Sequence, residues 1–328
     1  MWRRRAILGW IVAPIVGVGM RAFAQPATSP PIIGLLWLGN QTSEAPRLGG
    51  LRQGLKDHGL IEGGIVRLIS RYADNQPERL VDLARELVRE GSRVIVAIGT
   101  TSVSAARRAA PDTPIVMAGS ADPVAMGFAQ SLARPGGRIT GISVYGAELI
   151  GKQVQILKET LPTMRAFAAF LQAANPGNPV FRRGLGNTAD RLGLRIAIHD
   201  VEGVDHFAAA FEWANQQSVD ALYVIQDPIF LAHGRTIFGM AIDHRLPTMT
   251  GNVDLVRAGA LMAYTIDSIA AVRRSAYYVK EILRGADPAT LPIEQPTDVS
   301  LAINMATARA LGLRLPNALL GRASIVVE

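Results

Sequence analysis

Short polar loops follow several apolar runs of this sequence, and their residue types could bind the charged groups of a small solute. The loops carry Thr100, Thr101, Ser102, Asp122, Asn175 and Asp227. The first two loops are expected to open helices, after strands at 94–98 and 115–118. Open α/β sheets bind ligands at the carboxyl ends of their strands, and a helix N-terminus there attracts an anion. The pattern therefore predicts a site for a small carboxylate or zwitterion.

Each residue type suits one part of such a solute. The hydroxyl and N–H groups of residues 100–102 are expected to bind a carboxylate, and Asp122 and Asp227 an amine or hydroxyl. Asn175 and Asn252 would add hydrogen bonds. The alternative for the loops at 100–102, 122, 175 and 227 is that their side chains cap helices or turns. Their shared position at strand ends in both halves of the chain favours a cleft.

Three aromatic residues fall at or just past predicted strand ends. They are Trp37, Tyr145 and Tyr264. At these positions they could line the cleft and stack on an apolar part of the solute. The alternative is core packing, because large aromatic side chains are often buried.

Motifs for other chemistry are incomplete. Residues 146–153 nearly match a phosphate-binding loop, but Gln153 replaces the hydroxyl residue that would hold magnesium. The five histidines form no pair at helical metal-binding spacing. The sequence has no cysteine and no serine in a nucleophile elbow. We therefore expect no catalytic residue, no metal and no cofactor.

Apolar runs alternate with amphipathic stretches along the chain, which is typical of parallel α/β sheets. The alternation starts at residue 32, and a second run of it begins after a predicted helix at 149–161. We expect two Rossmann-like lobes with parallel central sheets, joined by a hinge of several strands. One lobe is predicted to contain residues 25–142 and about 252–292, and the other residues 143–251 and about 293–328.

The N-terminal residues indicate an export signal. Three arginines at 3–5 precede an apolar stretch at 6–20, and Ala22-Phe23-Ala24 precedes Gln25. We expect cleavage after residue 24 and a periplasmic protein with no membrane insertion afterwards. The export route is Sec or, given Arg4 and Arg5, the twin-arginine route.

The charge and composition of the chain argue against several classes of partner and modification. The formal net charge is +7, but four arginines precede residue 25 with no acid, which leaves +3 on the rest of the chain. No basic cluster is interleaved with aromatic residues, so we expect no nucleic-acid binding. Without cysteine, the chain has neither a disulfide nor an N-terminal lipid-bearing cysteine.

Several segments resemble a known family. They include ADPVAMGFAQSLARPGGRITGIS at 121–143, AELIGKQVQILKETLP at 147–162 and LPIEQPTDVSLAINMATARALGL at 291–313. The chain resembles ABC-transporter substrate-binding proteins of the tryptophan and tyrosine type, which have the type I periplasmic binding protein fold. The resemblance implies a non-enzymatic, monomeric receptor that presents an amino acid or related carboxylate to a permease and an ATPase.

Two other functions would use the same fold. A periplasmic sensing subunit would deliver its liganded state to a signalling receptor through the same cleft, and a hydrolase would need a nucleophile and a base that the sequence does not offer. The chain also departs from the family pattern at residues 37–40 and 263–266, both in candidate pocket loops. An aromatic amino acid is therefore an expectation for the family rather than for this chain.

Overall fold

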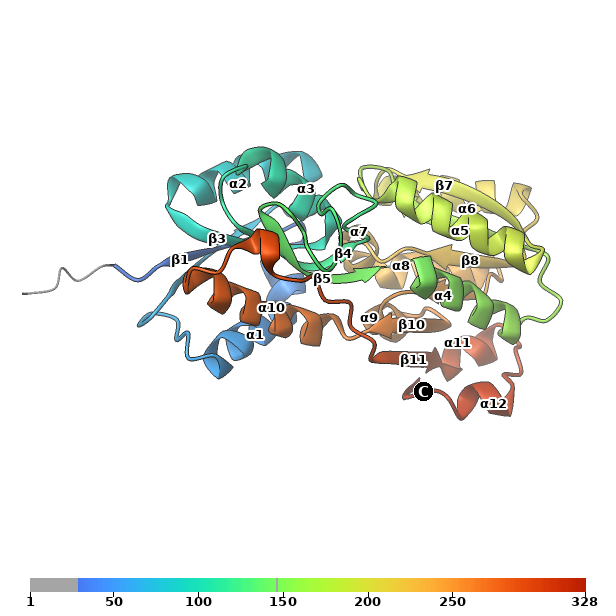
Figure 1. The fold of residues 1–328 in the computed structure, drawn as a ribbon. Helices are drawn as coiled ribbons and strands as arrows, with labels where there is room; N and C mark the ends of the chain where they lie inside the picture. Colours follow the sequence, from blue (N-terminus) through green and yellow to red (C-terminus); the bar gives the residue numbers. More distant parts are fainter. Residues whose placement is uncertain (1–28, 146) are drawn as a thin grey trace, which may run out of the picture.

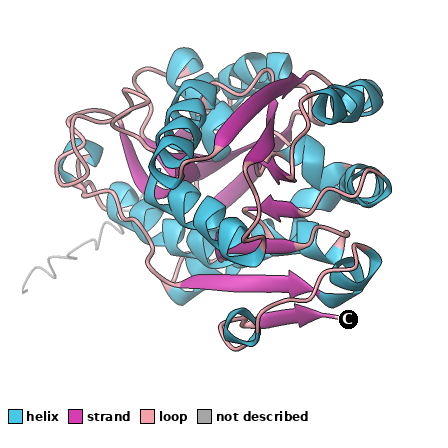
Figure 2. Ribbon diagram, turned by 90° about the vertical axis from the view of Figure 1, so that its right-hand side faces the viewer, coloured by secondary structure: helices cyan, strands magenta, loops and turns pink. Residues whose placement is uncertain are grey.

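The computed structural model describes residues 29–145 and 147–328. These residues form two α/β lobes that lie side by side (Figure 1). Seen from one end of the molecule, helices lie around the strands (Figure 2). The expected export signal at residues 1–24 lies outside the described residues.

Lobe 1 contains a five-stranded parallel sheet in the order β2-β1-β3-β4-β5. The strands are β1 (Ile32–Trp37), β2 (Arg67–Tyr72), β3 (Ser92–Ile98), β4 (Ile115–Ala121) and β5 (Ile139–Tyr145). The three inner strands are mostly apolar and buried, as expected for a sheet covered on both faces. Parallel pairing places all five carboxyl ends at one edge of the sheet.

Helices from both ends of the chain cover this sheet. They are α1 (Gln41–Asp57), α2 (Leu80–Arg89), α3 (Gly99–Ala109) and α10 (Ser268–Leu283), with single turns η1 (Pro77–Arg79) and η3 (Pro288–Thr290). The helix α2 buries Leu80, Ala84 and Leu87 as a stripe at helical spacing.

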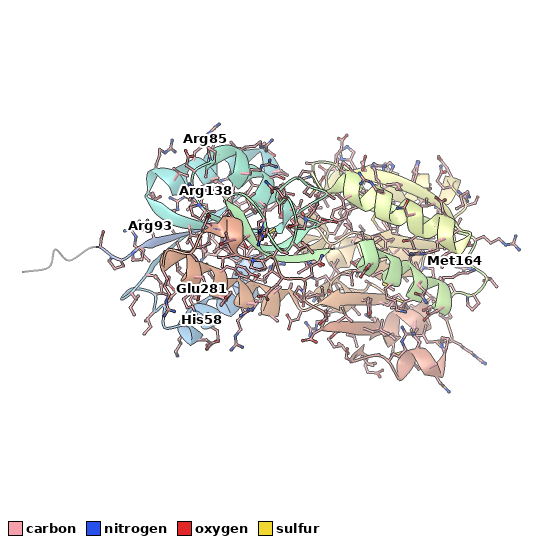
Figure 3. All side chains as sticks on the ribbon, in the orientation of Figure 1. His58, Arg85, Arg93, Arg138, Met164 and Glu281 are labelled. Carbon is pink, nitrogen blue, oxygen red and sulfur yellow. The ribbon has the colours of Figure 1, made fainter. Side chains whose placement is uncertain are left out.

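The helices α1 and α10 run parallel and in close contact, although they are far apart in the sequence (Figure 1). A Cβ at Gly50 would meet Ile269, and a Cβ at Gly54 would lie 2.2 Å from the carbonyl oxygen of Arg273. At the other end of the pair, His58 lies near Glu281 (Figure 3). Two glycines on one face of α1 thus allow the helices to approach closely.

Lobe 2 contains a seven-stranded sheet in the order β12-β11-β10-β9-β8-β6-β7. The strands are β6 (Ala166–Gln172), β7 (Arg195–Val201), β8 (Ala221–Val224), β9 (Thr248–Thr250), β10 (Met262–Ile266), β11 (Val299–Asn304) and β12 (Ile325–Val327). Strand β11 is antiparallel to β10 and parallel to β12, and the other pairs are parallel. The sheet is therefore mixed at one edge.

The helices of lobe 2 are α4 (Ala147–Thr160), α5 (Asn178–Leu192), α6 (Phe207–Gln216), α7 (Pro228–Ala232), α8 (Gly234–Asp243), α9 (Val253–Arg257), α11 (Met305–Ala310) and α12 (Asn317–Leu320), with the single turn η2 (Val204–His206). Their apolar faces and the sheet form one continuous core. Across the residues that the structure describes, no helix combines the length and the apolar character needed to span a bilayer.

The C-terminal return to lobe 1 begins later than residue 252. Strand β10 pairs with β9 and β11, so residues up to 266 belong to lobe 2. The return consists of α10 and the segment up to Glu294, which pairs with Ile142 of β5. Along the described residues, the chain therefore crosses between lobes after β5, after β10 and before β11.

Candidate functional site

A cavity lies between the two lobes, at the carboxyl ends of strands from both sheets. Its empty space, counted together with the part open to solvent, is about 830 Å³. Its polar and charged lining consists of Glu44, Arg47, Thr100, Thr101, Asn175, Gln226, Asp227, Thr265 and Ser268. Its apolar lining includes Leu38, Ile98, Ala118, Val144, Leu149, Phe181, Pro228, Leu231, Ile266, Ala271 and Val272.

The N-terminus of α3 forms part of the lobe 1 wall. Gly99 has a φ of +81°, which allows the chain to turn directly from β3 into α3. Among the described residues, no side chain caps this helix end, so its first N–H groups form a potential anion site. The Thr100 hydroxyl accepts a 2.9 Å hydrogen bond from the Ala121 N–H and ties the helix to the end of β4. Thr101 is half-buried beside it.

Asn175 and Asp227 form the facing part of the lobe 2 wall. Asp227 is 3% exposed and accepts hydrogen bonds from Asn175 Nδ2 at 2.9 Å and from the Ile229 N–H at 3.4 Å. Burial raises the pKa of Asp227 to about 6, although both hydrogen bonds lower it. Among the described residues, no cationic side chain pairs with Asp227. The site therefore offers a buried carboxyl group that a ligand cation could neutralise.

A charged pair from α1 also lines the cavity. Arg47 Nε donates a 2.7 Å hydrogen bond to Glu44, and the two side chains are 13% and 2% exposed. Burial raises the pKa of Glu44, while Arg47 and the Gly39 N–H oppose the rise. Neither residue is among those that the sequence predicts for the site. Their helical spacing of three residues is common on solvated surfaces, so it carries no signal for a cavity.

Residues 40–327 match the family described as ABC transporter substrate binding protein. The chain belongs to this family. It is therefore the substrate-binding component of an ABC transporter, and the family binds solutes rather than catalysing reactions.

Three known proteins illustrate the similarity. A tyrosine-binding protein from Clostridioides difficile (strain R20291) is 24% identical over 279 residues, which cover 84% of this chain and 80% of that protein. A conserved domain protein from Vibrio cholerae is 24% identical with a TM-score of 0.85, covering 90% of this chain and 99% of that one. An ABC domain in complex with L-Trp from Streptococcus pneumoniae is 22% identical with a TM-score of 0.84, covering 91% and 100%. The chain has the type I periplasmic binding protein fold, as expected.

Four of the ten predicted site residues line the cavity of this family member. They are Thr100, Thr101, Asn175 and Asp227. Five others do not line it, and the side chain of Tyr145 lies outside the described residues.

Trp37 and Ser102 are buried in lobe 1 instead. The alternation of β1 points Trp37 to the same side as Ile33 and Leu35, and its ring stacks on Tyr72 with 6.1 Å between ring centroids. Ser102 is fully buried within α3. Core packing therefore accounts for Trp37, and Leu38 is the β1-end residue that lines the cavity.

Asp122 and Asn252 act as local caps. No helix follows β4, and Asp122 accepts hydrogen bonds from the Val124 and Ala125 N–H groups in a turn. Asn252 accepts from the Asp254 N–H at 2.6 Å at the start of α9. These contacts give both side chains a local capping role.

Tyr264 lies at the hinge, beside a neighbouring cavity that it lines together with Lys152 and Gln295. Its carbonyl oxygen accepts a 2.6 Å hydrogen bond from Gln153 Nε2. Gln153 in turn accepts a 2.7 Å hydrogen bond from the Tyr223 hydroxyl. Gln153 is the last residue of the near match to a phosphate-binding loop. It is fully buried and has a structural role.

Proposed function

We propose that this substrate-binding protein takes up an amino acid, which it binds in the cavity between its lobes. The proposal depends on one observation: Asp227, buried and without a cationic partner among the described residues, faces the same cavity as the N-terminus of α3, which no described side chain caps. The two features complement the opposite charges of an amino acid head group.

The carboxylate of the amino acid binds the N–H groups at the start of α3 and the Thr101 hydroxyl. Its ammonium binds Asp227, which Asn175 holds in place. Because the carboxylate contacts lobe 1 and the ammonium contacts lobe 2, the ligand favours the closed arrangement of the lobes.

The side chain of the amino acid packs among the apolar residues of the cavity. Ile98, Val144, Leu149, Phe181 and Leu231 supply this surface. An aromatic side chain would bury the most apolar area there. The names of two relatives, a tyrosine-binding protein and a domain in complex with L-Trp, support an aromatic amino acid.

Calorimetry with the purified protein tests the proposal. L-phenylalanine, L-tyrosine and L-tryptophan should bind, whereas 3-phenylpropionate and phenethylamine, which each lack one charged group, should bind far more weakly. Asp227→Asn should weaken amino acid binding by at least about thirty-fold, because it removes the partner of a buried charge. Asp122→Asn changes a carboxylate outside the cavity and is the matched control. Equal binding by the two variants would contradict the proposal.

We also propose that residues 1–24 direct export and that the mature protein acts as a periplasmic monomer with a permease and an ATPase. The basic, apolar and small-residue segments at 3–5, 6–20 and 22–24 support this role. N-terminal sequencing of protein from the periplasmic fraction should begin at Gln25. A sequence that begins at Met1 would contradict cleavage.

A further inference from the structure

The Glu44–Arg47 pair has hydrogen-bonding capacity that the protein does not use. A guanidinium has five N–H donors, and Arg47 gives one of them to Glu44. No other described residue accepts a hydrogen bond from Arg47. Its side chain is 13% exposed, and Arg47 lines the cavity. The donors that Glu44 does not use are therefore available to a ligand in the cavity.

The structure around the pair holds Arg47 in this position. Glu44 fits against Gly39, where a Cβ would lie 2.3 Å from its carboxylate oxygen. The next turns of α1 pack against α10 through Gly50 and Gly54, which places Arg47 near the start of α10. Leu38, Ala271 and Val272 line the same region, so solvent competes little for the guanidinium once a ligand fills the space.

The charge of Glu44 decides which acceptor suits Arg47. Glu44 is 2% exposed and contacts Arg47 directly, so the pair together carries little net charge. A ligand carboxylate placed beside it would be a second buried negative charge with one cation between the two. A hydroxyl or amide oxygen accepts the same hydrogen bonds without that penalty.

From this geometry we infer that Arg47 is a specificity-determining residue: it binds a neutral oxygen on the side chain of the amino acid, and Glu44 positions it. The inference rests on the proposed function, because the head group is assigned to α3 and Asp227. It adds that the preferred substrate is an amino acid with a hydroxyl or amide group on its side chain.

Matched ligands test the role of Arg47. L-tyrosine should bind at least about ten-fold more tightly than L-phenylalanine, and L-asparagine more tightly than the similarly shaped L-leucine. Arg47→Met should abolish these preferences by reducing L-tyrosine affinity far more than L-phenylalanine affinity. A circular dichroism spectrum like that of wild type shows that the variant folds. Arg52→Met is the control, because Arg52 lies on the same helix outside the cavity and pairs with Glu62.

Glu44→Gln tests the positioning role with a readout that loss of structure would not produce. Without the Glu44 charge, Arg47 is uncompensated, so the variant should gain affinity for 4-carboxy-L-phenylalanine relative to L-tyrosine. Wild type should show the opposite order. Arg47→Lys keeps the charge without the planar donor set and should lose most of the tyrosine preference.

The outcomes separate the two proposals. If no amino acid binds to wild type, the proposed function fails and the role of Arg47 fails with it. If L-phenylalanine and L-tyrosine bind equally, only the role of Arg47 is overturned. An equal loss of both ligands in Arg47→Met also overturns it, since Arg47 would then bind the head group.

Discussion

The side-chain amide of Asn175 donates a 2.9 Å hydrogen bond to Asp227 and joins the loops after β6 and β8 at the cavity wall. The amide oxygen of Asn175 accepts from the Gly177 N–H at 2.8 Å, which fixes the NH₂ group toward Asp227. Asp227 thus has neutral hydrogen-bond partners and no countercharge among the described residues. The free protein holds this carboxyl group ready for a cation at the expense of its own stability.

Asp227→Asn should make the ligand-free protein more stable at neutral pH. The folded-state pKa of about 6 lies above the ordinary value of 3.8 for an aspartate, so the folded protein binds more protons and its stability falls as pH rises between these values. At neutral pH, ionised Asp227 then lowers the free energy of unfolding by about 3 kcal/mol. The variant removes this cost but loses one hydrogen bond, so its free energy of unfolding should rise by about 2 kcal/mol.

Urea unfolding measures this effect when it is carried out at neutral pH and again at a pH below 3.8. The gain should be present at neutral pH and disappear at acidic pH. Asp122→Asn should show no gain at neutral pH. An Asp227→Asn protein with a lower free energy of unfolding than wild type at neutral pH would contradict the cost assigned to the buried charge.

Amino acid affinity should depend on pH through the same group. A bound ammonium favours the ionised carboxylate, so binding should weaken as pH falls below about 6, by up to about ten-fold per pH unit. Calorimetry across this range in wild type and Asp227→Asn measures the effect. A pH dependence of the same size in both proteins would exclude Asp227 as its source.

Gly54→Ala should destabilise lobe 1 by separating α1 from α10. The added Cβ would lie 2.2 Å from the Arg273 carbonyl oxygen, and overpacking of this kind typically costs about 1–3 kcal/mol. Gly49 lies on the same helix with no atom near its Cβ position, so Gly49→Ala should be neutral or stabilise by up to about 1 kcal/mol. Thermal unfolding measures the effect: the midpoint temperature should fall clearly in Gly54→Ala and stay the same or rise in Gly49→Ala.

Gln153→Leu should destabilise lobe 2. The substitution leaves the buried Tyr223 hydroxyl without its acceptor and the Tyr264 carbonyl without its donor, which should cost about 2–4 kcal/mol in the free energy of unfolding. Gln155→Leu, two residues further along α4 and exposed, should change stability by about 0.5 kcal/mol or less. Similar values for both variants would mean that the hydrogen-bonded link contributes little.

Local sequence patterns were sufficient to predict most of the fold. The apolar runs at β3 and β4 and the stripe of α2 specify their elements through burial alone. The lobe assignment of β10 could not be predicted, because it depends on pairing with β9 and β11. The helix expected after Asp122 was wrong, since the same cap also suits a turn.

The site was less predictable, because cap residues and ligand-binding residues share one chemistry. Thr100 and Asp227 line the cavity, whereas Asn252 has an equally suitable side chain that caps α9. Glu44 and Arg47 line the cavity on α1, which packs against α10 more than 200 residues later in the chain, and no local pattern reports that contact. Long-range packing therefore decides which polar residues reach the ligand.

The packing of α1 against α10 also limits when lobe 1 can finish folding during synthesis. Val272, Ala276 and Val279 of α10 share one apolar cluster with Ile33 and Leu35 of β1. A nascent chain that has emerged only as far as β5 exposes this part of its interior to water. Lobe 1 cannot complete its fold before α10 has been synthesised, and α10 follows most of lobe 2 in the chain. Contacts so distant in sequence also form slowly. The chain thus stays incompletely folded until late in its synthesis.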